Sequence, residues 1–298
     1  MTSSLDLVAQ ILVTASPFIL AGLGGLTSEY AGRLNIGLEG MMLGGAFTAV
    51  AFAKLGAGMV AAIAAGAAAG IVCGIVLAAV NIRGGANIFI AGLAINLLVA
   101  GLVSFAGSWL FGTRSVIALG PESLSSRPIV ELFFVLLSLL SCAALWLYTS
   151  STRSGLRLRS VAQSSEMLTA RGVDTDKIRM LSIVVSGLFA GLAGAQLSLV
   201  LGAFVPNQSA GKGWIALVLV FVGAKHPLGI TISAIVFSLV GYWATEAQAH
   251  AEHPALLVAV PFIAVLAGLV LVQALRIFTT KVKLRRSIAG SSKHQIRP

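Results

Sequence analysis

The 298-residue chain has little charge and almost no cysteine. Only 10% of its residues are charged, 57% are hydrophobic, and the mean hydropathy is +0.97. Soluble domains contain about 25% charged residues, so this composition argues against an ordinary soluble protein. The two cysteines, Cys73 and Cys142, both lie in apolar runs. Their positions argue against a disulfide framework or a cysteine metal site and favour packing thiols.

The chain also lacks the short motifs of common enzyme classes, such as HExxH, CxxC and a Ser/His/Asp series. The GKG at residues 211–213 resembles part of a phosphate-binding loop, but Pro206 stands where that loop requires glycine, and no Ser or Thr follows Lys212. His250, Glu252 and His253 share one connection without a further ligand nearby, so we expect solvated side chains there. We therefore predict no catalysis, no metal, no cofactor and no ATP hydrolysis by this chain.

Long apolar runs occupy most of the sequence. A membrane-spanning helix needs about 20 mostly apolar residues, which leaves room for about eight or nine such helices. The run at residues 8–27 is interrupted by Pro17 and three glycines, and the run at residues 214–222 is too short to cross alone. The 33 glycines suit close helix packing in lipid. We predict an all-α polytopic membrane domain over residues 1–276, with some short or broken helices, and a basic tail at residues 277–298.

Basic residues gather in two places. Residues 150–180 hold six of the 20 Lys and Arg residues against three acidic ones, and the C-terminal tail holds seven more. The others sit at the ends of apolar runs, which is the pattern of the positive-inside rule and not of a nucleic-acid surface. We predict that residues 150–180 and the tail face the cytoplasm. Arg33 and Arg83 then also lie inside and Lys54, Arg114 and Arg127 outside, with the N-terminus outside unless the first segment folds back.

Two parts of the sequence share a weak internal pattern. Residues 40–74 and residues 214–241 each contain a short apolar segment, a lysine turn with glycine and a long apolar helix. The predicted topology makes the two parts run in opposite directions. Inverted repeats with short, interrupted segments point to the substrate site of a transporter, although shared low complexity could also produce the similarity.

Glu39 is the clearest polar outlier, because it is a carboxylate within the apolar stretch NIGLEGMMLGG. A charged group deep in a bilayer costs about 3 kcal/mol on insertion scales, so it usually faces a cavity or a partner. Two interpretations stay open. Glu39 either contributes to a substrate path or gate, or it accepts hydrogen bonds from backbone where a helix is broken.

Four amides and one tryptophan are further candidates for a substrate path. Each amide offers a donor and an acceptor, which suits a neutral polar ligand such as a sugar or nucleobase, but interhelical hydrogen bonds are the common alternative in membranes. The tryptophan could stack on a ring or anchor a helix at the membrane interface. These residues are Asn35, Asn87, Asn96, Gln196 and Trp214.

Four stretches together resemble the inner-membrane permease subunits of bacterial ATP-binding-cassette importers, in the branch that handles simple sugars, nucleosides and branched-chain amino acids. They are collinear and cover much of the chain. They read GLGGLTSEYAGRLNIGLEGMMLGGA (22–46), GGANIFIAGLAINLL (84–98), SGLRLRSVAQSSEMLTARGVDTDKIRMLSIVVSGLFAGLAGA (154–195) and GWIALVLVFVGAKHPLG (213–229). At VFVGAKHP, the last stretch departs somewhat from the usual sequence of the family.

The resemblance implies a partner for the basic loop. In such importers a short coupling helix in this loop sits in a groove of the cytoplasmic ATPase. It maps here to residues 161–172. The implied contact residues are Gln163, Ser165, Glu166, Leu168, Arg171 and Gly172.

The resemblance also implies the other components of the transporter. These are a second permease subunit, identical or different, and an extracellular substrate-binding protein, both working with this chain in a bacterial inner membrane. A purine-type nucleoside is the expected cargo, with a ribose-like sugar or riboflavin as alternatives. From a different class, a stand-alone secondary transporter would have to rely on Glu39 as its titratable group.

Overall fold

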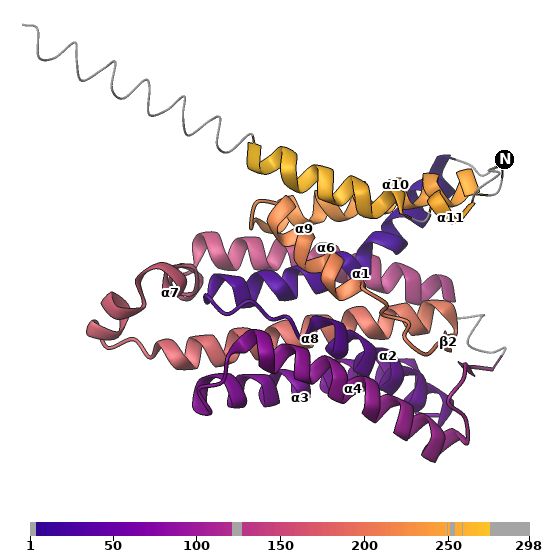
Figure 1. Ribbon diagram of the computed structural model, residues 1–298, viewed down its shortest axis with the longest axis horizontal. Helices are drawn as coiled ribbons and strands as arrows, with labels where there is room; N and C mark the ends of the chain where they lie inside the picture. The colour runs from indigo at the N-terminus through magenta and orange to yellow at the C-terminus, as the bar shows by residue number, and fades with distance from the viewer. Residues whose placement is uncertain (1–3, 121–126, 249, 251–253, 258, 275–298) are drawn as a thin grey trace, which may run out of the picture.

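The computed structural model describes residues 4–120, 127–248, 250, 254–257 and 259–274, and nearly all of them are helical (Figure 1). A two-residue antiparallel pair, β1 (Ile117–Ala118) with β2 (Ala203–Phe204), joins two connections. The longer helices are α1 (Ser4–Tyr30), α2 (Leu38–Lys54), α3 (Gly58–Ala78), α4 (Ile88–Phe111), α6 (Arg127–Ser151), α7 (Arg153–Ala170), α8 (Thr175–Leu201), α9 (Lys212–Val222) and α10 (Pro227–Gln248). The π-helix η1 (Ala79–Arg83) continues α3, and α11 (Pro254–Leu257) precedes a helix at Val260–Ala274.

Six helices of the described chain are long and apolar enough to cross a membrane: α1, α3 with η1, α4, α6, α8 and α10. The helix α2 and the apolar helices α9 and Val260–Ala274 are shorter. This set confirms the predicted class of an all-α polytopic membrane protein that includes short helices. Helix α1 is continuous through Pro17, so its first segment does not fold back as one of the two predicted topologies allowed.

The two ends of the bundle differ in the segments that they carry. Helix α7 lies at one end and the start of α1 at the other (Figure 1). Arg83 ends η1, which contacts α8, and α3 runs antiparallel to α8, so Arg83 lies toward the α7 end. At the opposite end, the Lys54 Nζ donates to the carbonyl of Ala118 in β1 (3.1 Å). The positions of Lys54 and Arg83 agree with the predicted alternation of basic residues between the two ends.

Helix α8 is the centre of the packing, because glycines let other backbones reach it. The backbones of Gly187 and Gly70 touch where α8 crosses α3, and Gly194 touches the carbonyl of Met42 in α2. A Cβ at any of these glycines would overlap backbone atoms. Close backbone approach of this kind provides the van der Waals contact that holds helices together in lipid.

The order of the elements has an inverted arrangement. A long helix, a short helix and another long helix follow one another as α1, α2, α3 and again as α8, α9, α10. Helix α8 packs on α2 and α3, and α1 packs correspondingly on α9 and α10. Figure 1 shows α3 and α4 on one side of the α1–α8 pair and α10 on the other. The short helices start next to each other and run in opposite directions, as the repeat in the sequence predicted.

Candidate functional site

The starts of α2 and α9 meet at Glu39. Its Oε1 accepts the backbone N–H of Gly211 (3.0 Å), and its Oε2 accepts that of Gly213 (2.8 Å). The first N–H groups of a helix have no partner within the helix, and a negative charge is favourable at that end. Glu39 therefore caps α9 from a distance of 172 residues in sequence. Gly213 is needed for this approach, because a Cβ there would lie 2.6 Å from the Glu39 backbone nitrogen.

Two asparagines fix the entry into α2. Asn96 of α4 accepts the N–H of Gly40 (2.8 Å) and donates to the carbonyl of Ile36 (3.1 Å). Asn35 is fully buried and donates to the Ser186 hydroxyl of α8 (3.0 Å). The Asn35 Oδ1 also accepts the N–H of Gly37 (2.9 Å), so both amides serve backbone N–H groups that the irregular turn before α2 leaves without a backbone partner.

Glu39 lies beside Asn96 and beside the first turn of α9, which carries Trp214, and we name these three residues the central junction. Gly40, next to Glu39, contacts Asn96, and Gly213, next to Trp214, contacts Glu39. Asn96 lies about 12 Å along α4 from its start, at the rise of an α-helix. Glu39 and Asn96 are only half-buried, and Trp214 is 41% exposed. A polar group at such depth costs free energy when it faces lipid. The exposed parts of these three residues are therefore a candidate contact for solute or a second subunit.

Gln196 lies outside this junction. Its Nε2 donates to the carbonyl of Val13 (3.0 Å) and to the Ser16 hydroxyl, which ties α8 to α1. Gln196 also lines a separate cavity of about 670 Å³ at the end opposite α7, together with Lys212. Asn87 accepts the N–H of Phe89 (2.8 Å) and caps α4. The structure therefore places Glu39 beside Asn96 and beside the turn that carries Trp214, with Asn35 buried close by, whereas Gln196 and Asn87 lie elsewhere.

Helix α7 is longer than the predicted coupling helix. It starts at Arg153, where Thr152 accepts the N–H of Gly155 (3.0 Å), and it is kinked at Ser164. Leu158 and Val161 are buried against the rest of the chain. The predicted single loop at residues 150–180 is also interrupted by the start of α8 at Thr175. There the N–H of Lys177 binds the Asp174 carboxylate (3.0 Å) and lowers the pKa of Asp174 below its ordinary value.

The predicted coupling residues lie in the second half of α7 and just after it. Neither Glu166 nor Arg171 forms an ion pair with another residue that the structure describes. Ser165 and Leu168 are half-buried. The exposed members of the set are Gln163, Glu166, Arg171 and Gly172. This half of α7 therefore offers a polar surface that the described part of the chain leaves uncovered.

Tyr30 connects α7 to α9, and nothing in the sequence indicated this link. The Arg159 guanidinium of α7 lies 5.7 Å from the centre of the Tyr30 ring. The Tyr30 hydroxyl donates to the carbonyl of Lys225 (2.8 Å), which follows α9, and Lys225 forms an ion pair with Glu29. Helix α9 is thus held by Tyr30 at one end and by Glu39 at the other. The aromatic residue in SEYAGR was visible, but its partner is 195 residues away.

Comparisons with known proteins give consistent matches over most of the chain. Residues 7–275 match the family described as "Branched-chain amino acid transport system / permease component". A "Putative glucose ABC transporter permease protein" of Haloferax volcanii is 34% identical over 80% of this chain and 77% of its own. The guanosine ABC transporter permease protein NupQ of Bacillus subtilis is 33% identical, over 78% and 79%. The nucleoside ABC transporter permease protein NupC of Lactococcus lactis is 30% identical, over 78% and 80%. No solved structure gives a significant match.

Proposed function

Because the chain belongs to the family of branched-chain amino acid transport system permease components, we propose that it is the membrane-spanning subunit of an importer that carries a nucleoside, of purine type, across a bacterial inner membrane. Membership of this family already identifies the chain as a transport subunit and not as a catalyst. Two of its relatives are named for guanosine and nucleoside transport.

The central junction is the observation that carries the proposal. It combines a carboxylate and an amide that are only part-buried with an indole ring that is 41% exposed among the described residues. A nucleoside combines a flat ring with neutral donors and acceptors. An indole can stack on the ring. The Asn96 amide keeps a second N–H and a further lone pair beyond its bonds to Ile36 and Gly40, and these can pair with the polar edge of the solute. A second permease subunit facing the central junction would close the path around the solute.

The energy for transport would enter at α7. Its exposed second half would dock on a separate cytoplasmic ATPase, which would hydrolyse ATP in place of this chain. Displacement of α7 would reach α9 through Tyr30 and Lys225, and α9 would carry it to Glu39 at the junction. A binding protein would deliver the solute at the opposite end. Together these steps form an alternating-access cycle.

The test is uptake by the assembled transporter in proteoliposomes, with the partner subunits that copurify with this chain. We expect ATP-dependent uptake of radiolabelled guanosine that unlabelled adenosine competes with and unlabelled glucose, ribose and riboflavin do not. Uptake of glucose or ribose with no guanosine uptake would overturn the nucleoside assignment and leave the family assignment intact.

A simple sugar is the second candidate, because the Haloferax relative is named for glucose and matches as well as the nucleoside relatives. The same competition series separates the two. A stand-alone secondary transporter is less favoured, because both oxygens of Glu39 already accept backbone N–H groups. Protonation of that carboxylate would remove part of the cap of α9. Uptake that persists without ATP would restore this alternative.

A further inference from the structure

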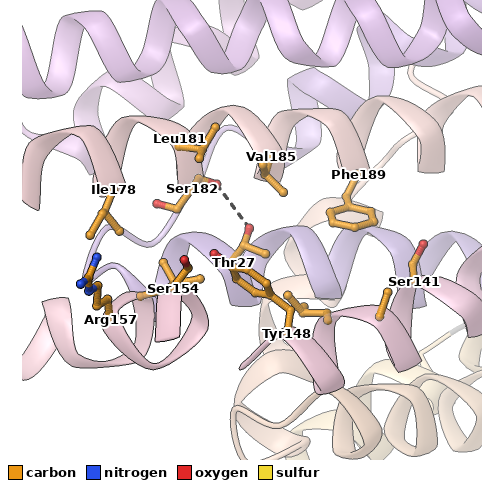
Figure 2. Close-up of a pocket in the computed structure, with 13 residues that line it drawn as sticks. Thr27, Ser141, Tyr148, Ser154, Arg157, Ile178, Leu181, Ser182, Val185 and Phe189 are labelled. Atoms are coloured by element: carbon orange, nitrogen blue, oxygen red, sulfur yellow. Dashed lines mark hydrogen bonds between the residues drawn. The ribbon is translucent and has the colours of Figure 1, made fainter. Parts of the chain in front are cut away.

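A groove runs between α6 and α8 at the α7 end of the bundle, with a volume of about 560 Å³ (Figure 2). Residues three or four apart share one face of a helix, and both helices line the groove with one such face. The lining is mostly apolar. Helix α6 contributes Ser141, Ala144, Leu145 and Tyr148, and α8 contributes Ile178, Leu181, Ser182, Val185 and Phe189.

The length of the groove corresponds to one leaflet of a membrane. Ile178 and Phe189 mark its ends on α8, and at 1.5 Å per residue they lie about 16 Å apart along the helix. This is about half of the roughly 30 Å thickness of a bilayer's hydrocarbon core. The floor is closed by α1, where the Thr27 hydroxyl donates to the carbonyl of Ser182 (3.3 Å; Figure 2). An extended hydrocarbon chain would fit this shape. A compact polar solute would leave much of the apolar lining without an apolar contact.

One end of the groove is basic. Arg157 of α7 lies at that end, and Ser141 and Phe189 lie at the other (Figure 2). None of the described residues that line the groove is acidic. Arg157 forms no ion pair with any residue that the structure describes. Ser154 is beside it, and Tyr148 contributes to the same end. The groove therefore combines an apolar body with a positive head.

We propose that this groove binds an anionic phospholipid, with one acyl chain between α6 and α8 and the phosphate at Arg157 and Ser154. The charge of Arg157, uncompensated among the described residues, selects the anionic headgroup. The apolar faces of the two helices select a chain that lies along the membrane normal. A lipid so placed would brace the first turn of α7 against α6 and α8. This site is independent of which solute the transporter carries.

The headgroup is tested by native mass spectrometry of the complete transporter, mixed with phosphatidylglycerol or with phosphatidylcholine of the same acyl chains. We expect tighter retention of phosphatidylglycerol. An arginine near an anionic lipid contributes about 1 kcal/mol, so Arg157→Gln should weaken phosphatidylglycerol binding about fivefold. Arg153→Gln is the matched control, because Arg153 begins the same helix but does not line the groove.

The acyl chain is tested by filling the groove without a change of charge. Ala144→Phe places a ring in the groove and should reduce the retention of bound phosphatidylglycerol. Ala143→Phe adds the same ring to an exposed position on α6 that does not line the groove, and it should bind lipid as the parent does. Gel filtration of both variants checks that the transporter still assembles.

Three results would overturn the proposal. Equal retention of the two lipids by the parent protein would show that the groove does not select an anionic headgroup. Equal weakening by Arg157→Gln and Arg153→Gln would show a diffuse charge effect and no site. Loss of assembly with the second permease in Ala144→Phe, with assembly kept in Ala143→Phe, would make the groove a subunit interface instead.

Discussion

The central junction and the second half of α7 are both rich in polar groups, but they satisfy those groups in opposite ways. At the junction, both Glu39 oxygens and both ends of the Asn96 amide have partners within the chain. On α7, Glu166 and Arg171 are exposed and form no ion pair with a described residue. A polar group with internal partners supports the shape of the protein, whereas an uncovered one is available to a partner molecule.

This difference gives each region its own expected signature. Substitution at the junction should change stability and transport together, since buried hydrogen bonds are costly to lose. Substitution on α7 should change transport alone, since exposed side chains away from special features contribute little to folding. Tyr30 contacts neither region directly but links the first half of α7, through Arg159, to the end of α9, through Lys225, so its substitution should give an effect between the two.

The largest effect is expected for Glu39→Ala. It removes two hydrogen bonds to a charged group, which should cost about 3 kcal/mol in the free energy of unfolding. Glu39→Gln keeps one acceptor oxygen and should cost about half as much. Thermal unfolding in detergent measures both. The exposed Glu246→Ala on α10 is the control and should change stability by less than about 0.5 kcal/mol.

The same pair of variants separates the two roles of Glu39. A Glu39→Gln protein that folds and also transports normally would leave Glu39 with the capping role alone. A Glu39→Gln protein of unchanged stability that no longer transports would instead place Glu39 in the solute path.

The next effect concerns transport and not folding. Glu166→Ala combined with Arg171→Ala should abolish ATP-driven uptake while unfolding changes by less than about 0.5 kcal/mol, because neither side chain is packed. Uptake assays and copurification of the ATPase measure it. Arg114→Ala with Glu246→Ala removes the same two kinds of charge from exposed positions at the opposite end, away from the ATPase, and should still copurify with the ATPase as the parent does. Normal uptake in the α7 pair would contradict the coupling assignment.

The smallest effect is expected for Tyr30→Phe. It removes one hydrogen bond to the Lys225 carbonyl, worth about 1 kcal/mol, and keeps the ring beneath Arg159. We expect ATPase activity to persist while uptake per ATP falls. Tyr242→Phe is the matched control, because the Tyr242 hydroxyl bonds only within α10, to Glu246 (3.3 Å). An equal fall in both variants would mean that Tyr30 does not transmit motion between α7 and α9.

Much of the fold could be predicted from local sequence. Apolar run lengths indicated the class and the short α9, and the spacing of Lys and Arg indicated which segments share an end. Both are sums over neighbouring residues, so they require no knowledge of contacts. The start of α8 within the predicted loop was missed, because Asp174 caps a polar first turn there that has no apolar periodicity. The tail at residues 277–298 lies outside the described residues, as do Glu252 and His253.

The candidate site was predictable in kind but not in arrangement. A carboxylate in an apolar stretch marked Glu39, and the amides marked Asn96 and Gln196. Hydropathy could not say that Glu39 and Asn96 share a junction while Gln196 ties α8 to α1. Their partners are 56 to 183 residues away in sequence. Such pairs depend on which helices cross and at what depth.

The sequence by itself thus determined that this chain is a polytopic membrane protein with one strongly basic segment between its apolar runs, because partitioning into lipid is decided residue by residue. Only the tertiary structure decided that the starts of α2 and α9 meet at one carboxylate and that Tyr30 joins α7 to α9. Those contacts follow from glycine-lined crossings around α8, such as Gly70 with Gly187, where backbones touch directly. The geometry of such crossings is a property of the whole bundle and not of any one segment.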